Sequence, residues 1–399
     1  MILSVAKKKG PKFIKHFIRD IKQKAPPPIY GLGKTSQNGH PDISNRPRHA
    51  LLSFITSPFR LSFTDPQNLQ FSLSGAARSI VQVLNDLGFV VDVVEWLDTK
   101  FKATKKYDLF IGHGGRNFKY ISNQLHEDIL KIYFSTGLYW KEHNRLELKR
   151  FDDLKKRKGV SLPYDRWIED SEEYANQIAD GIICLGNENV KASYSKFPLV
   201  INLNNGGYYD ARYESIRKDF SAGRKHFLFF SGGGNVHKGL DLLLEAFTQL
   251  DANLYICQGI RKDFYDVYRY ELEDVSNIHL IGPIDLKNKI FYELVDRCNF
   301  VIHPSCSEGQ PGSVIDMMHQ GLIPIVSHET HIDTNDFGIT LNDCSIEEIK
   351  RTVSEVSSYS PVLCEKMSKK TRWVAKTEYS EDAFSENIKN AIKFIYHAI

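Results

Sequence analysis

From His49 to the end of the chain, short apolar runs of strand length alternate with stretches that have the apolar periodicity of amphipathic helices. This alternation predicts repeated strand–helix units and a parallel sheet. The runs expected to form strands fall into two sets of six: 50–55, 90–95, 109–112, 131–135, 181–185 and 199–202, then 226–230, 253–257, 278–281, 300–304, 323–327 and 338–341. The pattern therefore predicts an α/β chain with two doubly wound domains.

The domain boundaries are predicted from length and composition. A chain of 399 residues is long enough for two domains and appendages. The polar segment 204–224, which contains Asn205, Gly206 and Gly207, is expected to link them. We expect a basic N-terminal appendage at 1–48, a first domain at 49–222, a second domain at 223–376 and an amphipathic C-terminal helix at 377–399. The apolar face of that helix would consist of Ala383, Phe384, Ile388, Ala391, Ile392 and Ile395.

Charge and cysteine usage exclude some classes of protein. A formal net charge of +3 is too small to make nucleic acid the expected partner. The 6 cysteines are far apart and show no CxxC pair or metal-ligand spacing, which indicates reduced core thiols in a cytosolic protein. The apolar runs are far shorter than the ~20 residues of a membrane span, so no transmembrane helix is expected.

The N-terminal segment 11–24 is the one locally basic region. If it is helical, Phe13, Ile14, Phe17, Ile18 and Ile21 share one face and most of the lysines lie on the other. Such a helix suits an anionic membrane surface, which would place the protein on the inner face of the cell membrane. The alternatives are a solvated basic tail and a helix whose apolar face packs on the body of the protein.

A first glycine-rich loop, residues 231–239, follows the apolar run that ends at Phe230. Gly232, Gly233 and Gly234 let a ligand approach the backbone, and Lys238, preceded by His237, can place an ammonium on a diphosphate. The loop is not a dinucleotide fingerprint, because His237 stands where GxGxxG needs glycine, and it is not a Walker loop. The structural alternative is a tight strand-to-helix turn with a surface lysine.

A second loop, residues 305–313, follows the run that ends near Pro304 and leads into a predicted helix. Glu308 lies just before this helix and Asp316 about one turn into it, so both carboxylates can face a ligand over the helix start. This spacing suits recognition of hydroxyl groups, with Glu308 nearer a sugar and Asp316 nearer a ribose. Alternatively, Glu308 only interacts with the helix dipole and Asp316 is a solvated surface residue.

Together the two loops resemble the retaining GT-B glycosyltransferases that use nucleotide sugars, of the glycosyltransferase family 4-like, bacterial cell-surface polysaccharide type. Residues 229–247, FFSGGGNVHKGLDLLLEAF, are similar to the family's diphosphate-binding segment. Residues 303–326, HPSCSEGQPGSVIDMMHQGLIPIV, are similar to its E-x7-E segment. The resemblance implies two Rossmann-like domains facing a central cleft, with the C-terminal helix packing back on the N-terminal domain.

The resemblance also implies roles for single residues. Lys238 would bind the donor phosphates, and Glu308, followed by Gly309, would contact the transferred sugar. Backbone N–H groups near Gly312 and Ser313 would hold the diphosphate, and Asp316 would hold the ribose.

The chain departs from the family pattern at two positions. Asp316 replaces a glutamate and is one methylene shorter. Gly233 stands where the family usually has an arginine, so half of the cationic clamp on the diphosphate is missing or is supplied by another residue such as His237 or Arg261.

The first half of the chain offers further candidates after its expected strands. His113 follows the third run and His143 lies after the fourth. Either could act near the transferred sugar, and either could be an ordinary polar residue of a loop. Tyr139 and Trp140 could stack on a sugar face or pack in the core.

The activity implied by the resemblance is that of a hexosyltransferase. A sugar would pass from a nucleotide diphosphate-sugar to a glycan or lipid-linked glycan, with retention of configuration and without a metal or any other cofactor. No Asp-rich DxD motif stands at a suitable strand end, which agrees with the absence of a metal. The alternatives are a GT-B-fold epimerase or phosphorylase, and a catalytically lapsed homologue that binds nucleotide or glycan.

Overall fold

The computed structural model describes residues 25–33, 47–61, 71–209 and 218–398. The described residues form two compact units, each built on one sheet. The seven-strand unit contains 25–33, 47–61, 71–142, 168–206 and 378–398, and the six-strand unit contains 143–167, 207–209 and 218–377. The chain passes between units at Gly206, inside the segment expected to be a linker, but also at 142/143 and 167/168, where no boundary is expected from the sequence.

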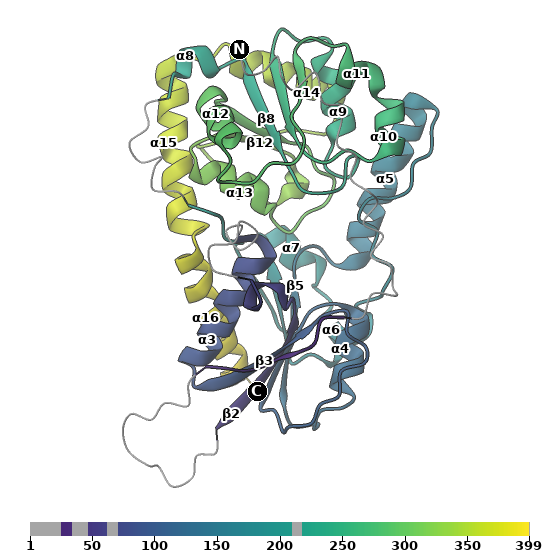
Figure 1. Ribbon diagram of the computed structural model, residues 1–399, viewed down its shortest axis with the longest axis vertical. Helices are drawn as coiled ribbons and strands as arrows, with labels where there is room; N and C mark the ends of the chain where they lie inside the picture. The colour runs from purple at the N-terminus through teal and green to yellow at the C-terminus, as the bar shows by residue number, and fades with distance from the viewer. Residues whose placement is uncertain (1–24, 34–46, 62–70, 210–217, 399) are drawn as a thin grey trace. The chain divides into compact units, whose positions relative to one another are not determined.

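The seven-strand sheet has the order β1-β3-β2-β4-β5-β6-β7. Its strands are β1 (Ile29–Leu32), β2 (Arg48–Phe54), β3 (Phe89–Glu95), β4 (Leu109–Gly112), β5 (Leu130–Ser135), β6 (Gly181–Leu185) and β7 (Val200–Leu203) (Figure 1). All neighbours are parallel except β1, which is antiparallel to β3. Strands β2 to β7 confirm the six predicted runs, with ends that shift by a residue or two.

Strand β1 lies in the segment that we expected to be an appendage. The sequence pattern misses it because only Ile29 and Leu32 in this short strand pack on the core. The N–H of Gly31 donates to Asp92 Oδ1 at 2.8 Å, which fixes the strand at the edge of the sheet. The basic segment 11–24 lies outside the described residues.

The C-terminal helix α16 (Glu381–Ala398) packs on α3 (Ala76–Asp86) within the seven-strand unit, as predicted (Figure 1). Phe384, Ile388 and Ile395 are buried with the residues of the sheet. A Cβ at Gly181 would lie 2.7 Å from the Ile395 side chain, so a glycine at this position lets the helix approach β6. The unit's other helices are η1 (Ser57–Phe59), η2 (Phe71–Gly75), α4 (Gly115–Ser122), α6 (Glu173–Ile178) and α7 (Glu188–Ser193).

The six-strand sheet is parallel throughout and has the order β10-β9-β8-β11-β12-β13. Its strands are β8 (His226–Phe230), β9 (Asn253–Cys257), β10 (Ile278–Leu280), β11 (Phe300–His303), β12 (Ile323–Val326) and β13 (Ile339–Thr340), which confirm the other six predicted runs (Figure 1). In such a sheet the strand order reverses between the first and fourth strands, and ligands bind outside the carboxyl ends of the strands at that point. Here the reversal lies between β8 and β11.

The helices of the six-strand unit are α8 (Phe220–Gly223), α9 (Leu240–Phe247), α10 (Lys262–Val267), α11 (Arg269–Glu273), α12 (Lys289–Arg297), α13 (Gly312–His319), η4 (His328–Thr330), α14 (Ile346–Ser357) and α15 (Pro361–Glu378). Helix α5 (Trp140–Lys158) contributes all of its residues from His143 onward to this unit. Among the described residues, no helix is long and apolar enough to span a membrane.

Candidate functional site

The two predicted loops follow β8 and β11, the neighbouring strands at which the order of the sheet reverses. The N–H of Cys306 donates to the carbonyl of His237 at 2.9 Å, which joins the second loop to the first. Gly239 has a φ of +80°, and a Cβ there would lie 2.3 Å from the carbonyl oxygen of Pro304. Only glycine fits this position, because it tolerates the positive φ and leaves room for the other loop.

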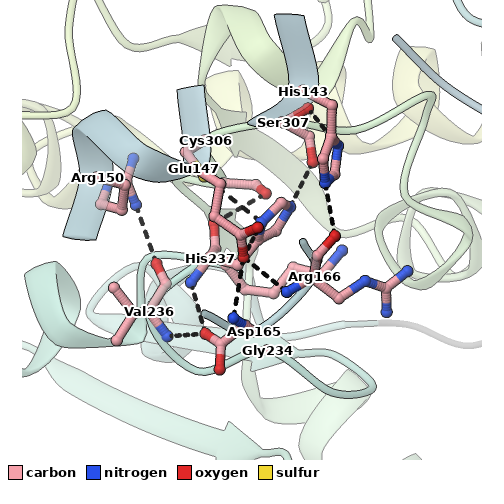
Figure 2. Close-up of polar contacts among 12 residues, drawn as sticks. His143, Glu147, Arg150, Asp165, Arg166, Gly234, Val236, His237, Cys306 and Ser307 are labelled. Carbon is pink, nitrogen blue, oxygen red and sulfur yellow. Dashed lines mark hydrogen bonds and ion pairs between the residues drawn. The ribbon is translucent and has the colours of Figure 1, made fainter. Parts of the chain in front are cut away.

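A buried arginine ties the same loops together. Arg150, on α5, donates through Nη1 to the carbonyl of Val236 at 3.4 Å (Figure 2). The same Nη1 donates to the carbonyl of Pro304 at 3.0 Å. Val236 lies within the first loop and Pro304 directly precedes the second, so a single guanidinium links the two loops.

Lys238 and Glu308 form an ion pair where the loops meet. Lys238 Nζ donates to Glu308 Oε1, and both side chains are almost completely buried. Ser305 Oγ donates to the same carboxylate oxygen at 2.6 Å, and His303 Nε2 lies 3.8 Å from it. The structure thus brings together the lysine of the first loop and the acid of the second.

The charge state of this pair follows from its surroundings. Burial alone would raise the pKa of Glu308, but Lys238 and the neighbouring imidazoles outweigh it, and the pKa lies well below its usual range. Burial lowers the pKa of Lys238, and the Glu308 carboxylate offsets part of that effect. At neutral pH the pair is therefore an ammonium and a carboxylate.

His237 is buried between the second loop and α5. Its Nε2–H donates to the carbonyl of Ser307 at 2.6 Å, and its Nδ1 lies 3.2 Å from Glu147 Oε1 and 3.6 Å from Cys306 Sγ (Figure 2). Burial lowers the pKa of His237 to about 3. The imidazole is therefore neutral at pH 7, and the role of His237 toward a donor stays a prediction.

His143 lies in the six-strand unit rather than with the first-half residues among which we expected it. Its Nε2–H donates to the carbonyl of Arg166 at 2.9 Å, and its Nδ1 lies 2.9 Å from Ser307 Oγ. Burial, and next the neighbouring His237, lower its pKa to about 4. His143 is positioned by α5, because residues 143, 147, 150, 154 and 157 of this helix fall on one face.

A carboxylate from the segment after α5 occupies the first loop. Asp165 Oδ2 accepts the N–H groups of Val236 and His237 at 2.8 and 2.9 Å (Figure 2). Asp165 Oδ1 accepts Arg261 Nη1 at 2.6 Å. Arg261 is also paired with Asp263 at 2.6 Å. The guanidinium of Arg261 is thus already engaged by two carboxylates, so it is not a free cation for a diphosphate.

One group of side chains in the described part of the chain has the composition of a metal site. The donor atoms of His143, Glu147 and His237 all lie within 4.8 Å of one another. The hydrogen bonds described above engage both histidines, while Glu147 Oε2 is buried and unpartnered. The group could hold a divalent ion, and its hydrogen bonds account for its geometry without one.

The remaining predicted donor residues surround the pair. A Cβ at Gly232 or Gly233 would have no atom within 4 Å, so the first loop is open at these positions. Gly234 has a φ of +98°, which favours glycine. In the second loop Gly309 is buried, and Gly312 and Ser313 begin α13. Their roles toward a donor stay predictions.

Asp316 is buried on α13 rather than solvated. Its Oδ1 accepts the N–H of Tyr208 at 2.6 Å. Burial raises the pKa of Asp316 to about 7, and the hydrogen bond from Tyr208 opposes the rise. The solvated alternative is therefore wrong, and the ribose-binding role stays a prediction.

His113 lies in the seven-strand unit, at the end of β4. Its Nδ1 is 2.9 Å from the carbonyl oxygen of Phe134, and its ring packs against those of Phe54 and Trp96. Burial lowers its pKa. In the same unit Tyr139 is buried against Tyr194, which agrees with the expectation that this side chain packs in the core rather than on a sugar.

Comparison with known proteins agrees with this architecture. Residues 212–374 match the model of the family described as Glycosyl transferases group 1, which is less than half of the chain. No curated protein matches this chain. Many solved structures match, and a sucrose-phosphate synthase from Thermosynechococcus elongatus does so with a TM-score of 0.60 and 13% identity over 89% of this chain and 100% of that one.

Two further structures are similar. HepE from Anabaena, solved in complex with UDP and glucose, has a TM-score of 0.57 and 10% identity over 87% of this chain and 100% of its own. TarM, of which an S. aureus structure is among the matches, has a TM-score of 0.52 and 16% identity. The match covers 71% of this chain and only 54% of the TarM chain. These likenesses establish the architecture.

The chain has the GT-B fold.

Within this GT-B chain, sequence reasoning missed several residues of the site: Glu147, Arg150, Asp165, Arg166, His303 and Ser305. The first two carry a signal, because with His143 they follow the helical spacing i, i+4, i+7. His303 and Ser305 flank Pro304 in the motif itself. No local pattern distinguishes Asp165 and Arg166, which come from a segment far from both loops in the sequence.

Proposed function

We propose that this GT-B chain is a glycosyltransferase that moves a hexosyl group from a nucleoside diphosphate sugar to a hydroxyl acceptor, with retention and without a metal. The observation that carries the proposal is the buried Lys238–Glu308 pair at the point where the sheet reverses its order. The match of 212–374 to the group 1 glycosyltransferases supports it independently of that geometry.

Each partner of the ion pair can still form hydrogen bonds with a nucleotide sugar. An ammonium has three N–H donors, so Lys238 can keep its bond to Glu308 and still donate to a phosphate oxygen. The free N–H groups at the start of α13, at Gly312 and Ser313, favour an anion through the helix dipole. Glu308, held by Ser305 and Lys238, would accept hydroxyl groups of the transferred sugar.

In the proposed reaction, the bond from the anomeric carbon to the donor diphosphate breaks and the acceptor oxygen forms its bond to that carbon. The proton of the acceptor hydroxyl passes to the departing diphosphate. Lys238 and the N–H groups of α13 stabilise the charge that grows on the leaving group, a contribution worth a few kcal/mol for each donor.

The similar structures support a class of substrate. HepE was solved with UDP and glucose, TarM with UDP, and WaaG is described as a glycosyltransferase of lipopolysaccharide biosynthesis. By analogy, a nucleotide sugar is the expected donor of this chain, and a glycan or lipid-linked glycan is the expected acceptor.

The test combines a binding screen with two single variants. UDP-, GDP- and TDP-sugars are first screened for the one that raises the Tm of the wild type most. With that donor, we expect Lys238→Ala and Glu308→Ala each to lower the rate of sugar transfer at least roughly tenfold, as expected for one lost transition-state contact. Circular dichroism should show that both variants remain folded.

Two controls separate chemistry from stability. Lys225→Ala removes an exposed lysine that pairs with Asp251 in the same unit, and it should leave the rate unchanged.

Either single variant at the buried Lys238–Glu308 pair leaves an uncompensated charge, which costs about 3 kcal/mol of folding free energy. The double variant Lys238→Met/Glu308→Gln removes both charges, so it should recover stability and stay inactive. Wild-type rates in both single variants would refute the proposal.

A lapsed enzyme that only binds nucleotide is the second candidate function. It is favoured by the Asp165 carboxylate, which occupies two N–H groups of the first loop. In that case the screen would find a bound nucleotide sugar, and no acceptor would give turnover.

A further inference from the structure

The charges around the Lys238–Glu308 pair are nearly balanced before any donor binds. Lys238 is neutralised by Glu308, and Arg261 by Asp165 and Asp263. A nucleoside diphosphate sugar brings a negative charge on each phosphate, and these paired groups leave no net positive charge to match it.

Arg166 is held against the first loop by its backbone. Its N–H donates to Glu147 Oε1 at 2.6 Å, and its carbonyl accepts Nε2–H of His143 at 2.9 Å (Figure 2). The preceding residue, Asp165, donates its own N–H to Glu147 Oε1 at 3.0 Å and holds the loop through its carboxylate. The side chain of Arg166 makes none of these bonds.

The Arg166 side chain begins beside the glycines of the loop. Its Cγ lies 3.4 Å from the position that a Cβ would take at Gly234. The neighbouring Gly232 and Gly233 face open space, since a Cβ there would meet no atom within 4 Å. A ligand can therefore lie along the loop next to Arg166.

The guanidinium of Arg166 is exposed and has no hydrogen-bond or ion-pair partner among the described residues. In Figure 2 it extends away from Asp165, and no dashed line reaches it. Its positive charge nevertheless acts on the site: burial is the main cause of the lowered pKa of Lys238, and the charge of Arg166 lowers that pKa further. Within the described part of the chain, Arg166 is thus an unpaired cation whose charge reaches Lys238.

We propose that Arg166 is a donor-binding residue that clamps the diphosphate of the nucleotide sugar opposite Lys238. This inference rests on the proposed function and names a residue for the same site. A guanidinium binds phosphate oxygens in a bidentate way, whereas the lysine acts as a point charge. His143, Glu147 and Asp165 would act as positioning residues, because they fix the backbone from which the guanidinium reaches out.

The variant Arg166→Ala is a clean test, because the anchoring bonds are made by the backbone and survive the substitution. The probe is whichever of UDP, GDP and TDP raises the Tm of the wild type most, together with its nucleoside. We expect Arg166→Ala to weaken binding of the nucleoside diphosphate roughly tenfold or more by calorimetry, and to leave binding of the nucleoside unchanged. Arg166→Lys should restore part of the loss.

Arg269→Ala is the matched control, since Arg269 is an exposed arginine of the same unit, and it should bind both probes as the wild type does. The inference fails alone if Lys238→Ala loses affinity for the diphosphate while Arg166→Ala keeps it. It also fails if Arg166→Ala loses nucleoside and diphosphate binding equally, which would indicate a structural role. If the wild type binds none of the three nucleotides, the proposed function fails as well.

Discussion

At the scale of single residues, Asp316 shows how burial changes a chemical role. A solvated aspartate ionises near pH 4, whereas this one holds its proton up to a pKa of about 7 because it is buried. The folded state therefore binds a proton that the unfolded state has lost between these two pH values. The stability contributed by this group consequently falls as the pH rises from about 4 to about 7.

The same titration should appear in donor binding. An ionised carboxylate accepts hydrogen bonds from ribose hydroxyl groups better than a neutral acid does, so affinity should increase as Asp316 loses its proton. We expect the affinity for a nucleotide sugar to rise roughly tenfold between pH 6 and pH 8 by calorimetry, as one titrating group predicts. A nucleotide sugar is the right probe because its diphosphate does not titrate in this range.

The control for this prediction is Asp316→Asn, which keeps the shape and removes the titration. Its affinity for the same nucleotide sugar should be the same at both pH values. A wild-type affinity that does not change with pH would show that Asp316 does not meet the ribose.

At the scale of elements, the local apolar patterns of the sequence predicted the positions of the strands and the buried face of the C-terminal helix. All twelve apolar runs form strands, and α16 buries the face that its periodicity indicates. The partner of α5 could not be predicted, because it is selected by contacts between distant residues. Arg150 reaches carbonyls 86 and 154 positions along the chain. No sequence pattern within the helix indicates that the buried Arg150 donates hydrogen bonds to those carbonyls.

Helix α5 also supports the two loops, and Arg150→Met tests this. We expect the loss of its buried hydrogen bonds to destabilise the protein by about 2 kcal/mol. Backbone amides of residues 231–239 and 303–310 should exchange hydrogen faster, because the guanidinium that spaces the loops is gone. Mass spectrometry of exchanged peptides resolves these segments.

Lys156→Met is the matched control on the same helix, because Lys156 is an exposed cation whose one ion pair among the described residues is with the nearby Asp153. It should leave both the Tm and the exchange rates unchanged. Unchanged exchange of the two loops in Arg150→Met would mean that other contacts hold them.

At the scale of the whole molecule, the two sheets and the reversal of strand order follow from the alternation of strands and helices along the sequence. The predicted convergence of the two loops follows from the same topology, since β8 and β11 are neighbours. What the sequence pattern could not show is that residues 143–167 belong to the six-strand unit. Asp165 and Arg166 therefore joined the site only when the structure placed this segment against the first loop, and His143, a candidate from the sequence, came to the same loop although we expected it in the first domain.

The most direct measurement is a crystal structure of the wild type with the nucleotide sugar that the Tm screen selects. We expect a phosphate oxygen within about 3 Å of Lys238 Nζ, and the sugar in contact with Glu308. A donor bound away from the carboxyl ends of β8 and β11, with the Lys238–Glu308 pair untouched, would contradict it.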